Sequence, residues 1–318
     1  MIMVKKQAQI ANFNVVFGED ESPMLDYFNS IIFPAMTSGI EKTSNDDKFM
    51  FMNIRTLKNH VGTYILTGIL VKKTILEIKS DLNEHGELIE KDEKHSSAPY
   101  SSFAINLLNH RMIFMPNQKG SPSIATFRGT VRYVIETFIE RENQQRDQGQ
   151  KLPDAEINVV GIPSAHSLGE LLDNVQKINS LTLRFYPLNG DIDFSEAFGI
   201  LANDMRNEVG SKNGEIVFKS PKSIHGVKNI LEKAAGTISP VLKVVTKNGS
   251  KATLKDFELS EKYEIAVDDS TDYQKEETQL IDKMSSIDAL AFSNAKHDEI
   301  YKRNLDKIDS MNWSGDFY

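Results

Sequence analysis

Cysteine is absent from the 318-residue sequence, which excludes disulfide bonds, thiolate metal sites and a cysteine nucleophile. No stretch approaches about 18 consecutive apolar residues, so the sequence predicts no membrane-spanning helix. The N-terminus also lacks the apolar run of a secretory signal. We therefore expect a cytoplasmic protein.

Recognisable catalytic motifs are missing as well. The seven histidines have no metal-ligand spacing, and neither a Gly-x-Ser-x-Gly elbow nor a phosphate-binding Walker loop occurs. We therefore assign no catalytic residue, no metal site and no cofactor from the sequence. This pattern favours a binding protein over an enzyme.

Charge is distributed unevenly along the chain, although the net charge is only −8. Residues 1–98 carry 11 basic and 14 acidic side chains, and residues 99–255 carry 19 basic and 15 acidic ones. Residues 256–318 carry 7 basic and 16 acidic side chains. The middle of the chain is thus basic and the C-terminal segment acidic, which predicts two surfaces with different partners.

Residues 99–139 give the clearest fold signal. Alternating apolar residues at 103–107 predict a strand, Asn109-His110 a turn, and 112–115 a buried partner strand. A helix should follow, with Ser121 as N-cap and Pro122 at its first position. Its apolar face is expected to contain Ile124, Phe127, Val131, Val134, Ile135 and Phe138.

Strands and helices alternate from residue 155 to residue 235, and a hairpin with Asn248-Gly249 at its turn follows. This order predicts an α+β fold with mixed sheets, ferredoxin-like β/α units and a C-terminal helix. We expect an N-terminal β-rich α+β domain at 1–150, an α/β domain with the basic segment at 151–270, and an acidic helix and tail at 271–318. Residues 81–98 are charged and hydrophilic and predict an exposed excursion or a flexible loop.

The basic segment at 211–255 holds nine lysines against Glu215 and Glu232. Lysines that neutralise DNA phosphates release counterions, whatever the base sequence, so this segment predicts a nucleic-acid surface. A solvated face, or pairing with the acidic C-terminal segment, explains the same residues equally well. The predicted binding residues are Lys119, Arg128, Arg132, Lys212, Lys219, Lys222, Lys228, Lys247 and Lys251.

Three shorter features have competing interpretations. The corner at 117–123, with Lys119, suits an anion at a helix start, but an ordinary turn and N-cap need the same residues. Glu77 and Lys79 form half of a metal-dependent nuclease motif, with Asp46 or Asp47 as further carboxylates, although an exposed strand face needs no more than these. The pair at 191 and 193 suits either a hard cation or a helix cap.

The segments SAPYSSF, NHRMIFMPNQKGSP and NVVGIPSAHSLGELLDNVQKINSLTLRFYPLNGDIDF resemble a group of uncharacterised prokaryotic proteins. The order of elements over residues 60–265 also resembles the A component of the phage lambda Rex exclusion system and the DNA-binding component of Kiwa defence. In those proteins a β-hairpin ends in a small-residue corner before a helix, and a lysine-rich stretch similar to EIVFKSPKSIHGVKN follows. The resemblance implies phage defence, as in abortive infection, through duplex DNA binding.

Our leading hypothesis is a homo-oligomeric anti-phage protein that binds duplex DNA non-specifically. The acidic segment at 271–309 would then dock on the lysines as a gate or bind a partner protein. A metal-dependent nuclease effector and an interaction adaptor without nucleic-acid binding are the alternatives.

Overall fold

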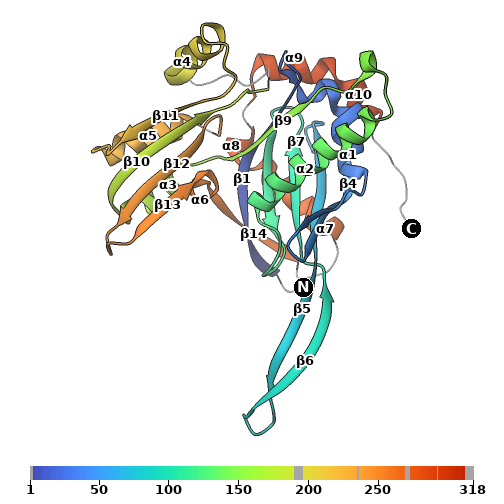
Figure 1. Ribbon diagram of the computed structural model, residues 1–318, viewed down its shortest axis with the longest axis vertical. Coiled ribbons are helices and arrows are strands. Elements are labelled where there is room, and N and C mark those ends of the chain that lie inside the picture. Colours follow the sequence, from blue (N-terminus) through green and yellow to red (C-terminus); the bar gives the residue numbers. More distant parts are fainter. Residues whose placement is uncertain (1–2, 190–195, 235, 269–272, 292, 312–318) are drawn as a thin grey trace.

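The chain folds around two antiparallel sheets in the computed structural model (Figure 1). The structure describes residues 3–189, 196–234, 236–268, 273–291 and 293–311. The predicted α+β class is confirmed, and every strand pairing in the described residues is antiparallel. The pair of acidic residues at 191 and 193 lies outside the described residues.

The large sheet has the strand order β14-β1-β8-β7-β5-β4-β3, with β2, β9 and β6 paired beside this path. The strands of this sheet place apolar side chains on both faces, because helices cover much of each face. The strands are β1 (Met3–Phe17), β2 (Ser22–Pro23), β3 (Lys42–Ser44), β4 (Asp47–Lys58), β5 (Tyr64–Leu82), β6 (Leu88–Ser97), β7 (Tyr100–Asn106), β8 (Arg111–Pro116), β9 (Ala155–Gly161) and β14 (Lys262–Asp268).

Strand β1 connects the two ends of the sequence. The first half of β1 pairs with β14 and its second half pairs with β9. In the sequence, β9 precedes the second sheet and β14 follows it, and both strands belong to the large sheet. An isolated bridge joins Pro163 to Ser260, and the Ser260 hydroxyl donates to the Ile10 carbonyl at 2.7 Å. The chain therefore leaves the large sheet and returns to it at adjacent points. The division of the sequence at 150 and 270 stays a prediction.

One face of the large sheet is covered by helix α2 (Ile124–Asn143), together with η1 (Met24–Tyr27), η2 (Phe28–Ile32) and α1 (Phe33–Thr37). Phe127 of α2 is fully buried and contacts one phenylalanine from each of four strands. The ring centroids lie 6.2 Å from Phe13, 5.5 Å from Phe51, 5.0 Å from Phe103 and 5.7 Å from Phe114. The edge-to-face angles suit the aromatic quadrupoles, so this cluster fixes the helix on the sheet.

The first part of the acidic C-terminal segment covers the opposite face, and the described residues of the segment form four helices where the sequence predicted one. These are α7 (Tyr273–Ser285), α8 (Asp288–Ala291), α9 (Ala295–Arg303) and α10 (Leu305–Asp309). Leu280, Ile281 and Met284 of α7 join the apolar core of that face. Helices α9 and α10 instead contribute Ile300, Tyr301 and Ile308 to the core on the α2 side.

Two consecutive buried glutamates fasten α7 to the large sheet. Glu276 accepts hydrogen bonds from Lys6 at 2.9 Å and from Ser102, and Glu277 accepts them from Arg55 at 3.0 Å and from Thr67 at 2.6 Å. Each buried carboxylate is therefore both neutralised and hydrogen-bonded, as burial of a charge requires.

The second sheet has the order β11-β10-β12-β13, and the described helices that pack on it cover one of its faces. Its strands are β10 (Val175–Phe185), β11 (Gly214–Lys219), β12 (Ser239–Thr246) and β13 (Lys251–Lys255), and its helices are α3 (Ala165–Asp173), α4 (Glu196–Asn207) and α5 (Ile224–Ala234). A short helix, α6 (Asp256–Leu259), leads back to β14. Gly161 is required beside α6, because a Cβ there would lie 2.6 Å from the Asp256 carbonyl oxygen.

Residues 81–98 form the exposed excursion that was predicted, but it is a long β-hairpin arm and not a loop. The distal half of β5 leaves the sheet and pairs with β6 alone, from Thr74–Ser97 to Leu82–Leu88 (Figure 1). The β-rich run at 74–80 predicts the distal part of β5, but β6 has no such signal, because nearly every side chain of the arm is exposed and no apolar alternation marks that strand.

The predicted start of α2 is also wrong by two residues. Ser123, in place of Ser121, is the N-cap and accepts a hydrogen bond from the Thr126 amide at 3.2 Å. Ser121 instead closes the preceding turn by accepting from the Gln118 amide. No helix in the described part of the chain is long and apolar enough to cross a membrane.

Replacing Phe127 with alanine should lower the free energy of unfolding by about 3–5 kcal/mol, because it removes the ring that four strands share. Chemical denaturation of the wild type and variant measures this change. Tyr133→Ala on the exposed side of the same helix is the matched control and should change stability little. Equal losses in both variants would contradict a central role for the cluster.

Replacing Glu277 with alanine should cost about 2–3 kcal/mol, less than the loss of a fully buried pair because Arg55 is partly exposed. The change leaves Arg55 without its carboxylate and Thr67 without its acceptor. Thermal unfolding measures the effect. Glu264→Ala, which removes an exposed partner of Lys5, should leave the midpoint unchanged. An unchanged midpoint in Glu277→Ala would show that α7 does not depend on this contact.

Candidate nucleic-acid interface

The second sheet leaves one face open to solvent, and its register determines which side chains lie there. Leu181, Leu183 and Phe185 of β10 point to the helices, so the intervening residues point to the open face. Cross-strand partners share a face. The open face therefore carries residues from all four strands. They are Lys177, Ser180, Thr182 and Arg184 of β10, Glu215, Val217 and Lys219 of β11, Ser239, Val241, Lys243 and Val245 of β12, and Lys251, Thr253 and Lys255 of β13.

Five lysines on this face are exposed, and none of them forms an ion pair with a described residue. They come from all four strands and are Lys177, Lys219, Lys243, Lys251 and Lys255. Lys219 and Lys243 flank Ser180 in one row across the sheet, which sets them about 10 Å apart at the usual spacing of strands. The one carboxylate of the open face, Glu215, pairs with Arg184 at 3.5 Å.

The structure separates the lysines that the sequence grouped together. Lys219 and Lys251 of the predicted site lie on the open face, and Lys243 and Lys255 of the same block join them. Lys228 lies on α5, on the covered side of the sheet, 3.8 Å from Glu232, and Lys222 lies in the loop before α5. The predicted set is thus brought together only in part.

Two further predicted lysines take separate positions. Lys212 donates to the carbonyl oxygens of Gly18 and Glu19 at 3.3 and 2.9 Å, which links the loop before β11 to the large sheet. Lys247 lies in the turn between β12 and β13, where its amide donates to the Asn174 carbonyl. Its exposed side chain lies at the end of the open face.

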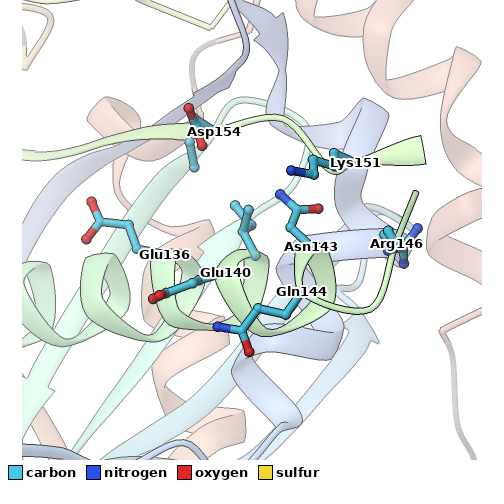
Figure 2. A pocket seen from close by; sticks show the side chains of 9 residues that line it. Glu136, Glu140, Asn143, Gln144, Arg146, Lys151 and Asp154 are labelled. Carbon is cyan, nitrogen blue, oxygen red and sulfur yellow. The ribbon is translucent and has the colours of Figure 1, made fainter. Parts of the chain in front are cut away.

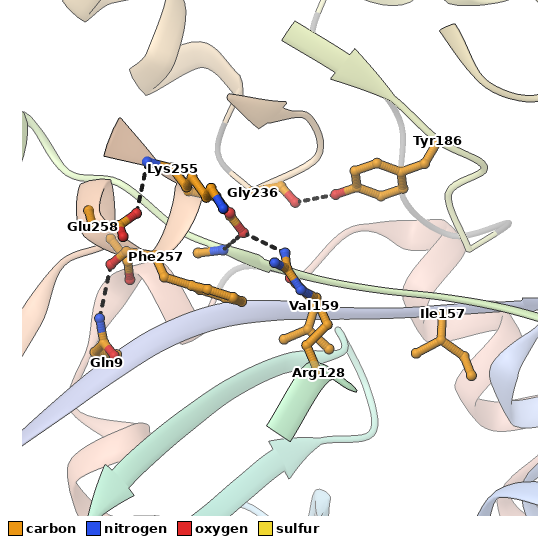
Figure 3. Close-up of polar contacts among 12 residues, drawn as sticks. Gln9, Arg128, Ile157, Val159, Tyr186, Gly236, Lys255, Phe257 and Glu258 are labelled. Carbon is orange, nitrogen blue, oxygen red and sulfur yellow. Dashed lines mark hydrogen bonds and ion pairs between the residues drawn. The ribbon is translucent and has the colours of Figure 1, made fainter. Parts of the chain in front are cut away.

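Arg128 joins the two sheets at the border of the open face. Its guanidinium donates to the Asp256 carboxylate at 3.2 Å and to the Val159 carbonyl at 3.3 Å, and it lies over the Phe257 ring at 4.5 Å. Figure 3 shows Arg128 reaching from α2 towards these groups. Arg128 is therefore committed to structure, and its charge is already neutralised.

Arg132, one turn further along α2, has no acidic partner among the described residues. It donates to the Ile157 carbonyl at 2.8 Å and is exposed. Arginine has five N–H donors, so most of its hydrogen-bonding capacity remains for a ligand. Of the two predicted arginines, Arg132 is thus the one available for binding.

Buried titratable groups behind this border have perturbed pKa values. Burial raises the pKa of Asp256, although the charge of Arg128 acts against that rise. Burial also raises the pKa of Tyr186, whose hydroxyl donates to the Gly236 carbonyl at 2.8 Å (Figure 3). Loss of hydration lowers the pKa of Arg111 to about 10, so it remains a cation at neutral pH. These groups form the wall between the sheets.

A hollow of about 720 Å³ lies between the open face and α2. Its charged lining residues are Arg128, Arg132, Arg184, Lys255, Glu215 and Asp256. The hollow extends the basic surface of the second sheet to the first three turns of α2.

A second hollow, of about 790 Å³, lies further along α2 and has the opposite character. Glu136, Glu140 and Asp154 line it with Arg146 and Lys151 (Figure 2). Arg146 is already paired with Glu142 at 2.9 Å. The exposed side of α2 thus changes from basic to acidic along its length, and a polyanion is favoured only at its first half.

The corner at 117–123 is an ordinary turn and helix cap. Gly120 has a φ of +88°, Ser121 closes the turn, and Ser123 caps α2. Lys119 is exposed on this turn, and no described contact joins it to the open face. The turn and the cap account for Gly120, Ser121 and Ser123, and binding of an anion at this corner stays a prediction.

The nuclease fragment lies on the β5–β6 arm. Glu77 pairs with Lys94 at 2.9 Å and with Lys79 at 3.0 Å, and these pairs lower the pKa of Glu77. Asp47 pairs with Lys72 at 2.8 Å. In the described part of the chain, no three His, Asp or Glu residues are arranged to hold a metal ion.

The predicted gate does not form in this structure. Glu276 and Glu277 of α7 are directed into the large sheet, towards Lys6 and Arg55. In the described part of the chain, no acidic side chain after residue 272 pairs with an open-face lysine. The acidic segment stabilises the other sheet instead. Its role in recruiting a protein partner stays a prediction.

Sequence reasoning missed Lys177 and Arg184, which lie outside the lysine-rich segment but on the same open face. The signal that identifies them is alternation along β10, where Leu181, Leu183 and Phe185 mark the covered side. The sequence pattern predicts a helix over 167–178 and a strand only from 180, whereas α3 ends at Asp173 and β10 begins at Val175. The alternation along β10 therefore could not be used to assign its two faces.

Comparison with known proteins adds no further identification. No protein-family model matches the sequence, and a search of curated proteins finds no significant match.

Proposed function

We propose that this protein binds nucleic acid without sequence specificity through the open face of the second sheet, with duplex DNA as its main ligand. The observation that carries the proposal is the gathering of five exposed lysines without ion-pair partners on one face of four adjacent strands. Unneutralised charges held this close repel one another, and a polyanion relieves that repulsion.

The chemistry of the face favours contacts with phosphates over the reading of bases. Its described residues are lysines, an arginine, a glutamate that pairs with this arginine, small hydroxyl residues and valines, with no aromatic ring on which a base can stack. Nor does it carry the asparagine or glutamine side chains that recognise adenine. Binding through lysines alone depends on the backbone and is therefore independent of base sequence.

A role in phage defence is part of the same proposal. Its support is the resemblance of the hairpin, the small-residue corner and the lysine-rich stretch to the Rex and Kiwa components. Non-specific binding of duplex DNA suits such a role, because a defence protein meets phage genomes of unrelated sequence. We propose that the protein acts in the cytoplasm as a homo-oligomer.

Affinity for a random-sequence duplex should fall steeply with salt. Contact of the five lysines with phosphates predicts a slope of about −4 to −5 in log affinity against log salt. Fluorescence anisotropy with a labelled duplex between about 50 and 200 mM salt measures the slope. Absence of binding at the lowest salt, or an affinity that does not respond to salt, would overturn the proposal.

Reversing three charges on the open face should abolish most of this binding. The variant Lys219→Glu, Lys243→Glu, Lys251→Glu should reduce the magnitude of the salt slope by about three. The matched control, Lys222→Glu, Lys228→Glu, Lys233→Glu, changes net charge equally, but its lysines lie in the loop before α5 and on α5. It should retain most of the affinity.

The same two variants distinguish an effect of the position of the charges on affinity from an effect of the total charge. Equal losses would show that only the overall charge matters, and would contradict an interface on the open face. In cells challenged with phage, protection should be lost with the open-face variant and kept with the control. If both variants protect the cells, the defence role does not depend on this surface.

A further inference from the structure

The hollow between the open face and α2 keeps an excess of positive charge after the ion pairs among its lining residues are counted. Four cations and two carboxylates line it. Arg128 pairs with Asp256 at 3.2 Å, and Arg184 pairs with Glu215 at 3.5 Å. Arg132 and Lys255 then remain without an acidic partner among the described residues.

Two uncompensated cations around one hollow call for a ligand with two negative charges. An internal phosphodiester of a nucleic acid carries one charge, whereas a phosphomonoester carries about −1.5 to −2 at neutral pH. The free N–H groups of Arg132 suit its oxygens, because guanidinium and phosphate form paired, charge-assisted hydrogen bonds. The charge of the hollow therefore matches the terminal phosphate of a strand better than its internal phosphates.

The size and lining of the hollow support the same ligand. Its volume of about 720 Å³ is that of a site for one small molecule, and is too small for a duplex. Phe185 and Tyr186 line it but are buried, and the Tyr186 hydroxyl is occupied by the Gly236 carbonyl. Without an exposed ring in the described lining, the phosphate has to supply the recognition.

We propose that this hollow binds the phosphomonoester at the end of a nucleic-acid strand whose backbone lies on the open face. Lys255 belongs both to the hollow and to the open face, so a strand crossing β13 and β12 reaches Arg132 at the border. This inference rests on the proposed function. A free mononucleotide has the same phosphate chemistry and is the other source of such a group.

The experiment measures the affinity of the full-length protein for three duplexes of one sequence, each about 20 base pairs long. The duplexes carry 5′-phosphate, 3′-phosphate or only hydroxyl ends. Adenosine monophosphate and adenosine serve as the mononucleotide probe and its control. We expect at least one phosphorylated duplex to bind about tenfold more tightly than the hydroxyl-ended one, the factor that one charge-assisted contact supplies.

Two variants test the residues that we assign. Arg132→Gln and Lys255→Gln should each bring the ratio of phosphorylated to hydroxyl-ended affinity close to one. Both side chains are exposed, so the two substitutions leave the cores intact. Lys251→Gln, on the open face but outside the hollow, should weaken all three duplexes equally and preserve the ratio. Loss of the preference in Lys251→Gln, or its retention in both other variants, would overturn the assignment.

The outcomes separate this inference from the proposed function. Equal binding of all three duplexes by the wild type overturns the inference and leaves non-specific binding in place. If no duplex binds but adenosine monophosphate does so in an Arg132-dependent manner, the proposed function fails and the phosphomonoester site stands as a nucleotide site. If neither binds, both fail.

Discussion

The packing of Phe127 against four phenylalanines of the large sheet is the interaction on which the rest of the arrangement depends. It fixes the rotation of α2, since a buried ring at one position sets the direction of every other side chain on the helix. Arg128 and Arg132 are consequently presented to β9, where they bind the carbonyl groups of Val159 and Ile157. One aromatic cluster in the core thereby positions two cations at the border of the second sheet, on the far side of the helix.

Much of the fold was predictable wherever one face of an element is buried and the other is not. The alternation at 103–107 and the apolar stripe of α2 identified β7, β8 and the helix, and Asn248-Gly249 identified the hairpin of β12 and β13. Strand β6 was missed because both of its faces are exposed and it carries no such pattern. The cap of α2 was misplaced because Ser121 and Ser123 both have the chemistry of a cap, and only the turn geometry at Gly120 decides between them.

The candidate site shows a different limit of sequence reasoning. The density of lysines in 211–255 identified the right part of the chain, but density along a sequence does not say which side of a sheet a residue occupies. Lys228 and Lys243 belong to the same lysine-rich segment but lie on opposite sides of the sheet, whereas Lys177 lies outside that segment and is one of the open-face lysines. Nothing in the sequence marked Arg132 as different from Arg128, because the carboxylate that distinguishes them, Asp256, comes from another element. Burial likewise explains why Glu276 and Glu277, which looked like part of an acidic surface, serve as anchors of α7.

The bridge between Pro163 and Ser260 has a consequence for how this molecule can change. The residues between them form a closed excursion from the large sheet, and both β9 and β14 keep their places beside β1 whatever the excursion contains. Insertions and exchanges are tolerated best where the two ends of a segment lie close together. The framework that holds α2 and the surface that carries the lysines are therefore free to diverge at different rates, and the electrostatic face can be remodelled by selection without dismantling its support.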